Sequence, residues 1–250
     1  MFLSKLRSLL AVLEIDGAIR ALIEWPKFSI ASFLIVTRLK HAGVSPKTVI
    51  DVGANVGQFA VAASRLFSGA QIFSIEPDEM TAARLRKNLK SEGNVDVLVT
   101  AVGDYIGEAV FHRNKDSQVS SILALGEDRI SAFPQATVVE EIKVPISTLD
   151  ALFLKHLLNK PILVKIDVQG AEDKVIRGGA EFLQSVEWVL MEVTFADLYD
   201  GEMDFRGISS LMMQAGFKFV RPLNFHVSPL TGEIIEMDAL FQRLERREVV

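Results

Sequence analysis

The sequence predicts an α/β fold built on a doubly wound, mostly parallel sheet, with helices before it and a hairpin inserted into it. Three observations lead to this prediction. From residue 48 onward, short apolar runs that suit strands buried on both faces alternate with helical stretches. The first run ends in a glycine-punctuated turn, residues 51–57, that leads into a helix. The next run ends in a carboxylate, Glu76.

The N-terminal residues are expected to be helical as far as about residue 41. Phe2, Leu6, Leu9 and other apolar residues recur at three- and four-residue spacing, and Trp25-Pro26 marks a break between two helical pieces. We expect a helical cap over residues 1–45 that packs on the main domain. The alternative is a surface helix that contacts membrane lipid or a partner.

The remaining elements follow from alternating apolar runs and helical periodicity. The expected strands span 48–52, 71–75, 95–102, 162–166, 188–193, 217–220 and 234–241, the last of them antiparallel. The expected helices span 57–67, 78–91, 149–158, 171–183 (interrupted at Gly178-Gly179) and 205–215. Strands at 108–112 and 138–144 predict a hairpin-like insertion over about 107–144. Because there is no repeat and no Pro/Ser-rich linker, residues 46–250 are expected to form one domain.

Composition narrows the class of protein. The chain has 250 residues, 49% of them hydrophobic, which is enough for a sizeable core. Its net charge of −5 gives no global reason to expect a nucleic-acid partner. The sequence contains no cysteine, which excludes thiolate catalysis and disulfides and suits a reducing, cytoplasmic location. The apolar run at 28–36 is far shorter than the ~20 residues of a membrane span, so no transmembrane segment is expected.

The turn after the first strand has the chemistry of a ligand site. Gly53 and Gly57 allow a tight turn and a close approach of a ligand to the backbone, and the following helix points its free N–H groups into the same crevice. The G-x-G-x-x-G pattern of dinucleotide enzymes is absent, because Ala54 and Asn55 occupy this turn. The carboxylate of Asp51 would repel a pyrophosphate and suits a cation such as a sulfonium or an α-amino group. An ordinary turn is the alternative, since Gly and Asn are common turn residues.

Glu76 has the position of a ribose ligand. A carboxylate at the end of the second strand is placed to accept hydrogen bonds from both ribose hydroxyls. Acidic residues are also favoured where a helix begins, and Asp78 and Glu79 fit that simpler explanation. Glu76 lies earlier, on the strand, and fits the ribose role better.

Two further acids, Asp167 and Glu172, follow the fourth core strand. Either could serve as a general base for an acceptor hydroxyl. Both could instead be structural, with Glu172 stabilising the start of a helix and Asp167 capping that helix or pairing with Lys165, although a site role is favoured for Asp167. Together with Glu192 they could bind a divalent cation, but the cluster lacks histidine and has no recognised ligand spacing, so we expect no metal. His112, on the insertion, is a weaker candidate for the base.

Several of these motifs resemble the FkbM-type methyltransferases, a branch of the S-adenosylmethionine-dependent, Rossmann-like class I methyltransferases. The resemblance covers residues 48–220. The matching segments are 51–57 (DVGANVG), 75–77 (IEP), 101–104 (AVGD), 120–122 (SSI), 165–172 (KIDVQGAE) and 191–193 (MEV). The segment 165–172 is the most specific of them. Gln169 departs from the glutamate usual in the family.

The resemblance implies a role for each part of the site. The methionine part of the cofactor would lie among Asp51, Gly53, Asn55 and Gly57. Glu76 would hold the ribose, and Gly103 and Asp104 would lie near the adenine. The implied reaction is O-methylation of a hydroxyl on a sugar or natural-product acceptor, that is, a small molecule or a glycan.

Two alternatives from other classes stay open at this point. One is an NAD(P)-dependent oxidoreductase on the same type of sheet, which the missing third glycine argues against. The other is a non-catalytic, methyltransferase-like module that binds a partner through its N-terminal helices. The sequence identifies neither the methyl acceptor nor the oligomeric state.

Overall fold

The computed structural model describes residues 23, 29–114, 117, 120–124, 138–195, 198–199, 201–227 and 232–244. Within them, a seven-stranded sheet has the order β3-β2-β1-β7-β8-β10-β9. Its strands are β1 (Thr48–Val52), β2 (Gln71–Ile75), β3 (Val95–Leu98), β7 (Ile162–Ile166), β8 (Trp188–Thr194), β9 (Phe217–Val227) and β10 (Ile234–Arg243). All neighbours from β3 to β8 pair in parallel, and β10 runs antiparallel to both β8 and β9.

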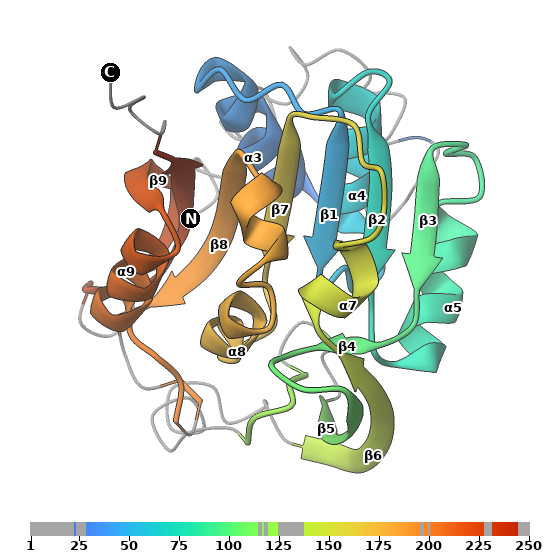
Figure 1. Cartoon of the computed structure of the whole chain (residues 1–250). Coiled ribbons are helices and arrows are strands. Elements are labelled where there is room, and N and C mark those ends of the chain that lie inside the picture. Colours follow the sequence, from blue (N-terminus) through green and yellow to red (C-terminus); the bar gives the residue numbers. More distant parts are fainter. Residues whose placement is uncertain are drawn as a thin grey trace.

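Helices cover both faces of this sheet (Figure 1). On one face lie α3 (Ile30–His41), α4 (Gln58–Leu66) and α5 (Glu79–Asn88); on the other lie α7 (Leu149–Phe153), α8 (Glu172–Arg177) and α9 (Phe205–Gln214). Successive strand residues point to opposite faces, so Val49 packs in the first core and Ile50 in the second. The predicted doubly wound, mostly parallel sheet is confirmed.

A second, three-stranded sheet carries the insertion, with the order β4-β6-β5. It consists of β4 (Ala101–Val102), β5 (Gly107–Asn114) and β6 (Val138–Ser147). The predicted hairpin is therefore present, with β5 and β6 antiparallel. Its small core contains Phe111, Val144 and Ile146.

The single strand predicted over 95–102 is wrong, because the chain divides it between the two sheets. β3 ends at Leu98, and Ala101 and Val102 pair with β6 instead. The hydroxyl of Thr100 donates to the carbonyl of Pro145 at 3.1 Å and so fastens the crossover to the insertion.

Two predicted helices are shorter than expected. The helix predicted over 149–158 ends at Phe153. The chain after it runs toward β1, where the hydroxyl of Thr48 donates to the carbonyl of Asn159 at 2.8 Å. The helix over 171–183 ends at Arg177, before a 3-10 turn η2 (Phe182–Ser185). Gly178 approaches the backbone of Gly103 so closely that an added Cβ would lie 1.9 Å from the Gly103 oxygen.

The N-terminal predictions are tested only in part. The described helix α3 packs on α4 through Phe33, Val36 and Leu39, and the helical cap over residues 1–45 as a whole stays a prediction. The amphipathic stretch before it and the Trp25-Pro26 break lie outside the described residues. No helix among the described residues is long and apolar enough to cross a membrane.

Candidate active site

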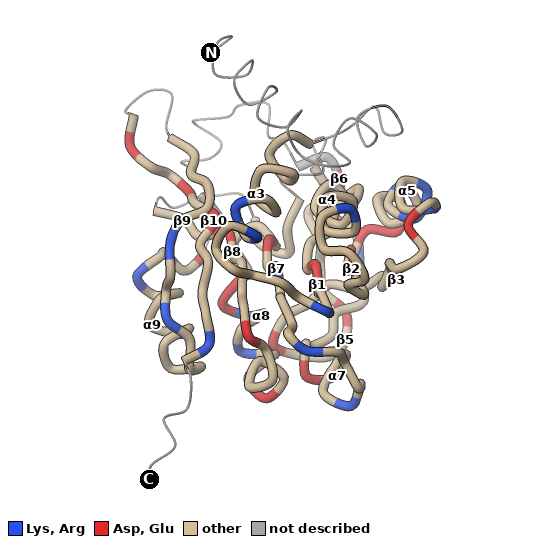
Figure 2. Tube along the Cα trace, turned by 90° about the horizontal axis from the view of Figure 1, so that it is seen from above, with Lys and Arg blue, Asp and Glu red and all other residues tan. Residues whose placement is uncertain are grey.

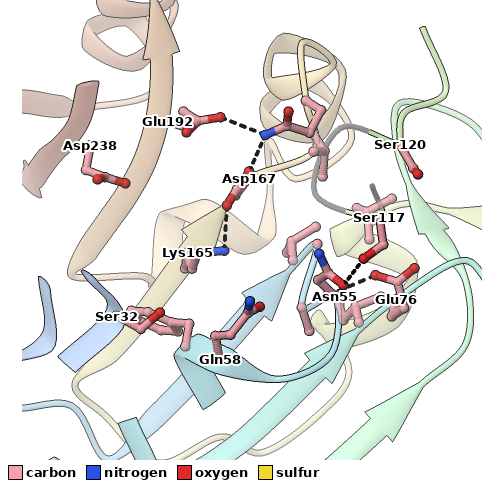
Figure 3. Close-up of a pocket in the computed structure, with 18 of the residues that line it drawn as sticks. Ser32, Asn55, Gln58, Glu76, Ser117, Ser120, Lys165, Asp167, Glu192 and Asp238 are labelled. Atoms are coloured by element: carbon pink, nitrogen blue, oxygen red, sulfur yellow. Dashed lines mark hydrogen bonds and ion pairs between the residues drawn. The ribbon is translucent and has the colours of Figure 1, made fainter. Parts of the chain in front are cut away.

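A cavity of about 530 Å³ opens where the parallel strands end, in the range of ordinary small-molecule sites. Its walls come from the glycine turn after β1, the end of β2, the loop after β7, strands β8 to β10, the insertion and the start of α3. The polar residues that line it include Ser32, Asn55, Gln58, Glu76, Ser117, Ser120, Lys165, Asp167, Glu192 and Asp238 (Figure 3).

The glycine turn forms one wall because its backbone adopts conformations that most residues avoid. Gly53 has φ +78°, and a Cβ there would lie 1.8 Å from the carbonyl oxygen of Asp167. Asn55 is also left-handed, at φ +49°, and its side-chain oxygen accepts a hydrogen bond from Ser117 of the insertion at 2.9 Å. Because Gly53 lies so close to the carbonyl of Asp167, the turn after β1 packs directly against the loop after β7.

Glu76 lies at the same wall, as predicted for a ribose ligand, with only 6% of its surface exposed. One carboxylate oxygen accepts from the backbone N–H of Asn55 at 3.0 Å and the other from that of Asp78 at 3.1 Å. Burial raises the pKa of Glu76 to about 7, although these two backbone hydrogen bonds oppose the shift. The carboxylate is thus fixed in orientation and keeps lone pairs for further donors.

Asp51 does not line the cavity. Its side chain is completely buried and lies 3.3 Å from the ammonium group of Lys165, which does line the cavity. Burial raises the pKa of Asp51, and the charge of Lys165 opposes that shift. For Lys165, burial alone would lower the pKa, but the carboxylates of Asp167 and Asp51 outweigh it and raise the pKa. Lys165 is therefore a cation between two acids.

The loop after β7 brings Asp167 into the cavity and holds it through two donors. The ammonium group of Lys165 lies 3.1 Å from one carboxylate oxygen, and the side-chain amide of Gln169 donates to the other at 2.8 Å. The same Gln169 nitrogen donates to Glu192 at 2.7 Å, while its oxygen accepts from the hydroxyl of Tyr199 at 2.6 Å. Gln169, left-handed at φ +59°, thus ties two carboxylates together.

Glu172, the other predicted acid, lies behind this loop and outside the cavity lining. One of its oxygens accepts from the backbone N–H of Val168 at 2.9 Å, so the side chain supports the loop that carries Asp167. Burial raises its pKa to about 8 despite that hydrogen bond.

Four other predicted site residues lie outside the lining. Gly57 caps α4 at φ +95° and packs on Leu85. Gly103 donates to the Ser147 carbonyl at 2.9 Å, and Asp104 is exposed beside it. His112 alternates with Phe111 on β5; Phe111 lines the cavity, and the His112 ring lies 3.5 Å from Glu141.

Several lining residues were not predicted. Lys165 and Gln169 lie inside the segment 165–172 that resembles the family, near the end of a predicted strand. Their position could therefore have identified them as cavity-lining residues. Asn224, His226, Glu236 and Asp238 come from β9 and β10, and no motif marks them. Among the described residues, no group of three or more His, Asp or Glu side chains is arranged to hold a metal ion.

Comparison with known proteins places this geometry in context. The family model described as Methyltransferase FkbM domain matches residues 51–219. The 2-O-methyltransferase NoeI of Sinorhizobium fredii is 29% identical over 170 residues, which is 66% of this chain and 70% of NoeI. The hexuronic acid methyltransferase AglP of Haloferax volcanii is 32% identical over 146 residues, 57% of this chain and 54% of AglP.

Among solved structures, the N-terminal domain of EvdMO1, crystallised in the presence of SAH and D-fucose, is similar in fold. Its TM-score is 0.50 at 9% sequence identity, and the match covers 86% of this chain and 83% of that domain. At this identity the likeness concerns the fold alone.

Proposed function

Because this chain belongs to the FkbM methyltransferase family, we propose that it transfers a methyl group from S-adenosylmethionine to a hydroxyl oxygen of a sugar or natural-product acceptor. The observation that carries the proposal is one cavity lined by two differently held acids, Glu76 and Asp167. Family membership leaves no reason to pursue the oxidoreductase alternative.

The residues of the glycine wall suit the cofactor. The buried carboxylate of Glu76 has lone pairs left for two hydroxyl donors, as a ribose would supply. Gly53 and Asn55 bring backbone close to the cavity without bulky side chains. We retain these three in the proposed cofactor site and assign Asp51 an indirect role, in which it holds the cation of Lys165 in place.

The bound cofactor supplies a methyl group carried on a positively charged sulfur. The protein's own contribution is first to hold the acceptor hydroxyl in line with that methyl group, and positioning of this kind supplies roughly 7–11 kcal/mol. The cofactor, held by Gly53, Asn55 and Glu76, would supply the methyl group, and Asp167 would accept the proton that the acceptor hydroxyl loses. A positioned base of this kind contributes ~10²–10⁴-fold.

The local charges favour Asp167 over Glu192 as that base. Burial and four neighbouring carboxylates raise the pKa of Glu192 well above its usual range, which disfavours the ionised form that a base needs. The side chain of Asp167 is 33% exposed, and its carboxylate lies 3.1 Å from the ammonium group of Lys165. His112, outside the cavity lining, receives no role in this mechanism.

Two measurements test the proposal. Calorimetric titration with S-adenosylhomocysteine tests the cofactor site. Transfer of a labelled methyl group from S-adenosylmethionine to an extract fractionated by chemical class tests the reaction. Binding together with base-stable labelling of one fraction supports a methyltransferase that forms no methyl ester, and identification of the labelled group as a methyl ether supports an O-methyltransferase. Binding with no transfer to any fraction would leave the non-catalytic module as the better description, and no binding would refute the cofactor site.

A further inference from the structure

The end of the cavity away from Glu76 is formed by five polar side chains that we call the C-terminal wall: Glu192, Asn224, His226, Glu236 and Asp238. Strand register aligns them in two rows. Glu192 of β8 is opposite Asp238 of β10, which is opposite Asn224 of β9; in the next row Glu236 is opposite His226. Figure 3 shows Glu192 and Asp238 on one side of the cavity, and Asn55 and Glu76 on the other.

The central pair of this wall is two acids directly across from each other. Like charges at opposed positions of neighbouring strands destabilise a sheet. Burial, followed by the charge of Asp167, raises the pKa of Asp238 to about 6, and burial and neighbouring acids raise the pKa of Glu192 well above its usual range. The fold therefore tolerates an unfavourable pair on a surface that faces an open cavity.

The hydrogen-bonding capacity of the wall is mostly that of an acceptor. Both amide hydrogens of Gln169 are already donated, one to Asp167 and one to Glu192. The amide nitrogen of Asn224 lies 3.3 Å from the ring of His226 and thus faces another group of the wall. Carboxylates accept hydrogen bonds and, when ionised, donate none, so a ligand that fits this wall brings donors of its own.

The charge balance of the cavity points the same way. Among the described residues that line it, Lys165 is the one Lys or Arg, and it is already paired with Asp51 and Asp167. In Figure 2, acidic positions lie along the inner strands near β7 and β8, whereas basic positions lie on outer elements such as α5 and α9. A carboxylate or phosphate on the ligand would face acids here without an unpaired fixed cation among these residues.

Most of the wall lies beyond the region that the family model matches, which ends at residue 219. Asn224, His226, Glu236 and Asp238 all follow it. Family membership therefore says nothing about these four residues, and their role has to be argued from the geometry of this chain.

We propose that the methyl acceptor presents hydroxyl or ammonium groups to the C-terminal wall and carries no carboxylate or phosphate on that side. In chemical terms it is a neutral or amine-bearing sugar ring, in contrast to the hexuronic acid named for the relative AglP. This inference rests on the proposed function, because it assumes that the acceptor occupies the part of the cavity opposite the cofactor.

The test uses the full chain saturated with S-adenosylhomocysteine. Three methyl glycosides that differ in one group, those of glucose, glucosamine and glucuronic acid, are titrated calorimetrically at neutral pH. We expect the first two to bind about tenfold or more tightly than the glucuronide, because placing like charges together is strongly unfavourable. The substitution Asp238→Asn should reduce this preference. Asp96→Asn, at an exposed acid on the edge strand β3, is the matched control and should leave it unchanged.

The outcomes separate the two proposals. Tighter or equal binding of the glucuronide overturns the inference about the wall, as does the absence of binding by all three sugars when S-adenosylhomocysteine binds. Failure of S-adenosylhomocysteine itself to bind refutes the proposed function and, with it, the inference. A preference against the glucuronide that survives Asp238→Asn unchanged would show that the C-terminal wall is not its source.

Discussion

The substitution Glu76→Gln tests the cofactor site most directly. We expect it to weaken binding of S-adenosylhomocysteine by about 10- to 100-fold, because hydrogen bonds to a charged group contribute about 1.5–3 kcal/mol. Both oxygens of Glu76 already accept backbone N–H groups, from Asn55 and Asp78. A glutamine at this position keeps one oxygen acceptor, but its NH₂ group faces the other backbone N–H. The expected loss of affinity therefore includes the loss of a fixed side-chain orientation.

The pH dependence gives a second, independent signature of the same residue. In the free protein burial raises the pKa of Glu76 to about 7, and the ionised form is the one that accepts two ribose hydroxyls. Below pH 7 the carboxyl must first lose its proton, so each pH unit costs up to about 1.4 kcal/mol, or about tenfold in affinity. Binding should therefore be about tenfold weaker at pH 6 than at pH 8, and Glu76→Gln should lack this step.

The assay is calorimetry between about pH 5.5 and 8.5, with thermal unfolding to verify that the variant folds. Glu79→Gln is the matched control, since Glu79 is exposed on α5 and pairs with Arg86. Asp238, whose pKa is about 6, also titrates in this range, so the decisive quantity is the difference between wild type and variant at each pH. A folded Glu76→Gln protein that binds like wild type at every pH would refute the ribose assignment.

Three further predictions concern the loops around the cavity. Gly53→Ala should abolish cofactor binding and lower the melting temperature more than Gly69→Ala does. Both glycines have a similar positive φ, but nothing lies within 4 Å of a Cβ added at Gly69. Gly69→Ala should therefore lose only the left-handed strain energy of about 1–2 kcal/mol. Asp167→Asn should lower kcat by ~10²–10⁴-fold with cofactor affinity nearly unchanged in calorimetry, whereas Asp173→Asn, at a residue outside the cavity lining, should leave kcat near wild type. Glu172→Gln should flatten the pH dependence of the free energy of unfolding measured in denaturant. The pKa of Glu172 is about 8 in the folded protein against 4.5 unfolded, so this residue stabilises the protein most at low pH. Between pH 4.5 and pH 8 that stabilisation falls by up to about 1.4 kcal/mol per pH unit.

Each of these has a clear contrary result. Equal destabilisation by Gly53→Ala and Gly69→Ala would mean that the turn and the Asp167 loop are not in the tight contact described here. Full turnover by Asp167→Asn would remove it as the base and direct attention to Glu192. A wild-type pH profile for Glu172→Gln would show that its carboxyl is ionised in the folded protein.

The parts of the site that sequence could predict are those encoded by neighbours in the chain. The glycine turn and Glu76 each lie at the end of a short apolar run, and the carboxyl ends of parallel strands necessarily meet at one edge of the sheet. Their mutual contact, from the N–H of Asn55 to Glu76, follows from that rule.

The parts that it could not predict depend on packing between distant segments. Asp51 lies within β1 opposite Ser74, before the strand end that carries Glu76, and its buried carboxylate pairs with Lys165, whose side chain lines the cavity instead. For His112, the alternation along β5 was evident, yet which face meets the cavity depends on how the insertion docks. The C-terminal wall depends on the placement of β10 between β8 and β9, which no local pattern encodes.

The contacts of the insertion indicate how the two ends of the cavity are kept in register. Ser117 donates to Asn55 in the glycine turn, and Ser121 donates to the backbone oxygen of Gln169 at 2.6 Å. The first contact reaches the proposed cofactor side, and the second reaches the residue that holds Asp167 and Glu192. Since a displacement of about 1 Å at a reacting group can cost about 10²-fold in rate, a segment fastened to both sides is well placed to maintain in-line geometry. In the proposed mechanism, the described part of the insertion thus acts through position.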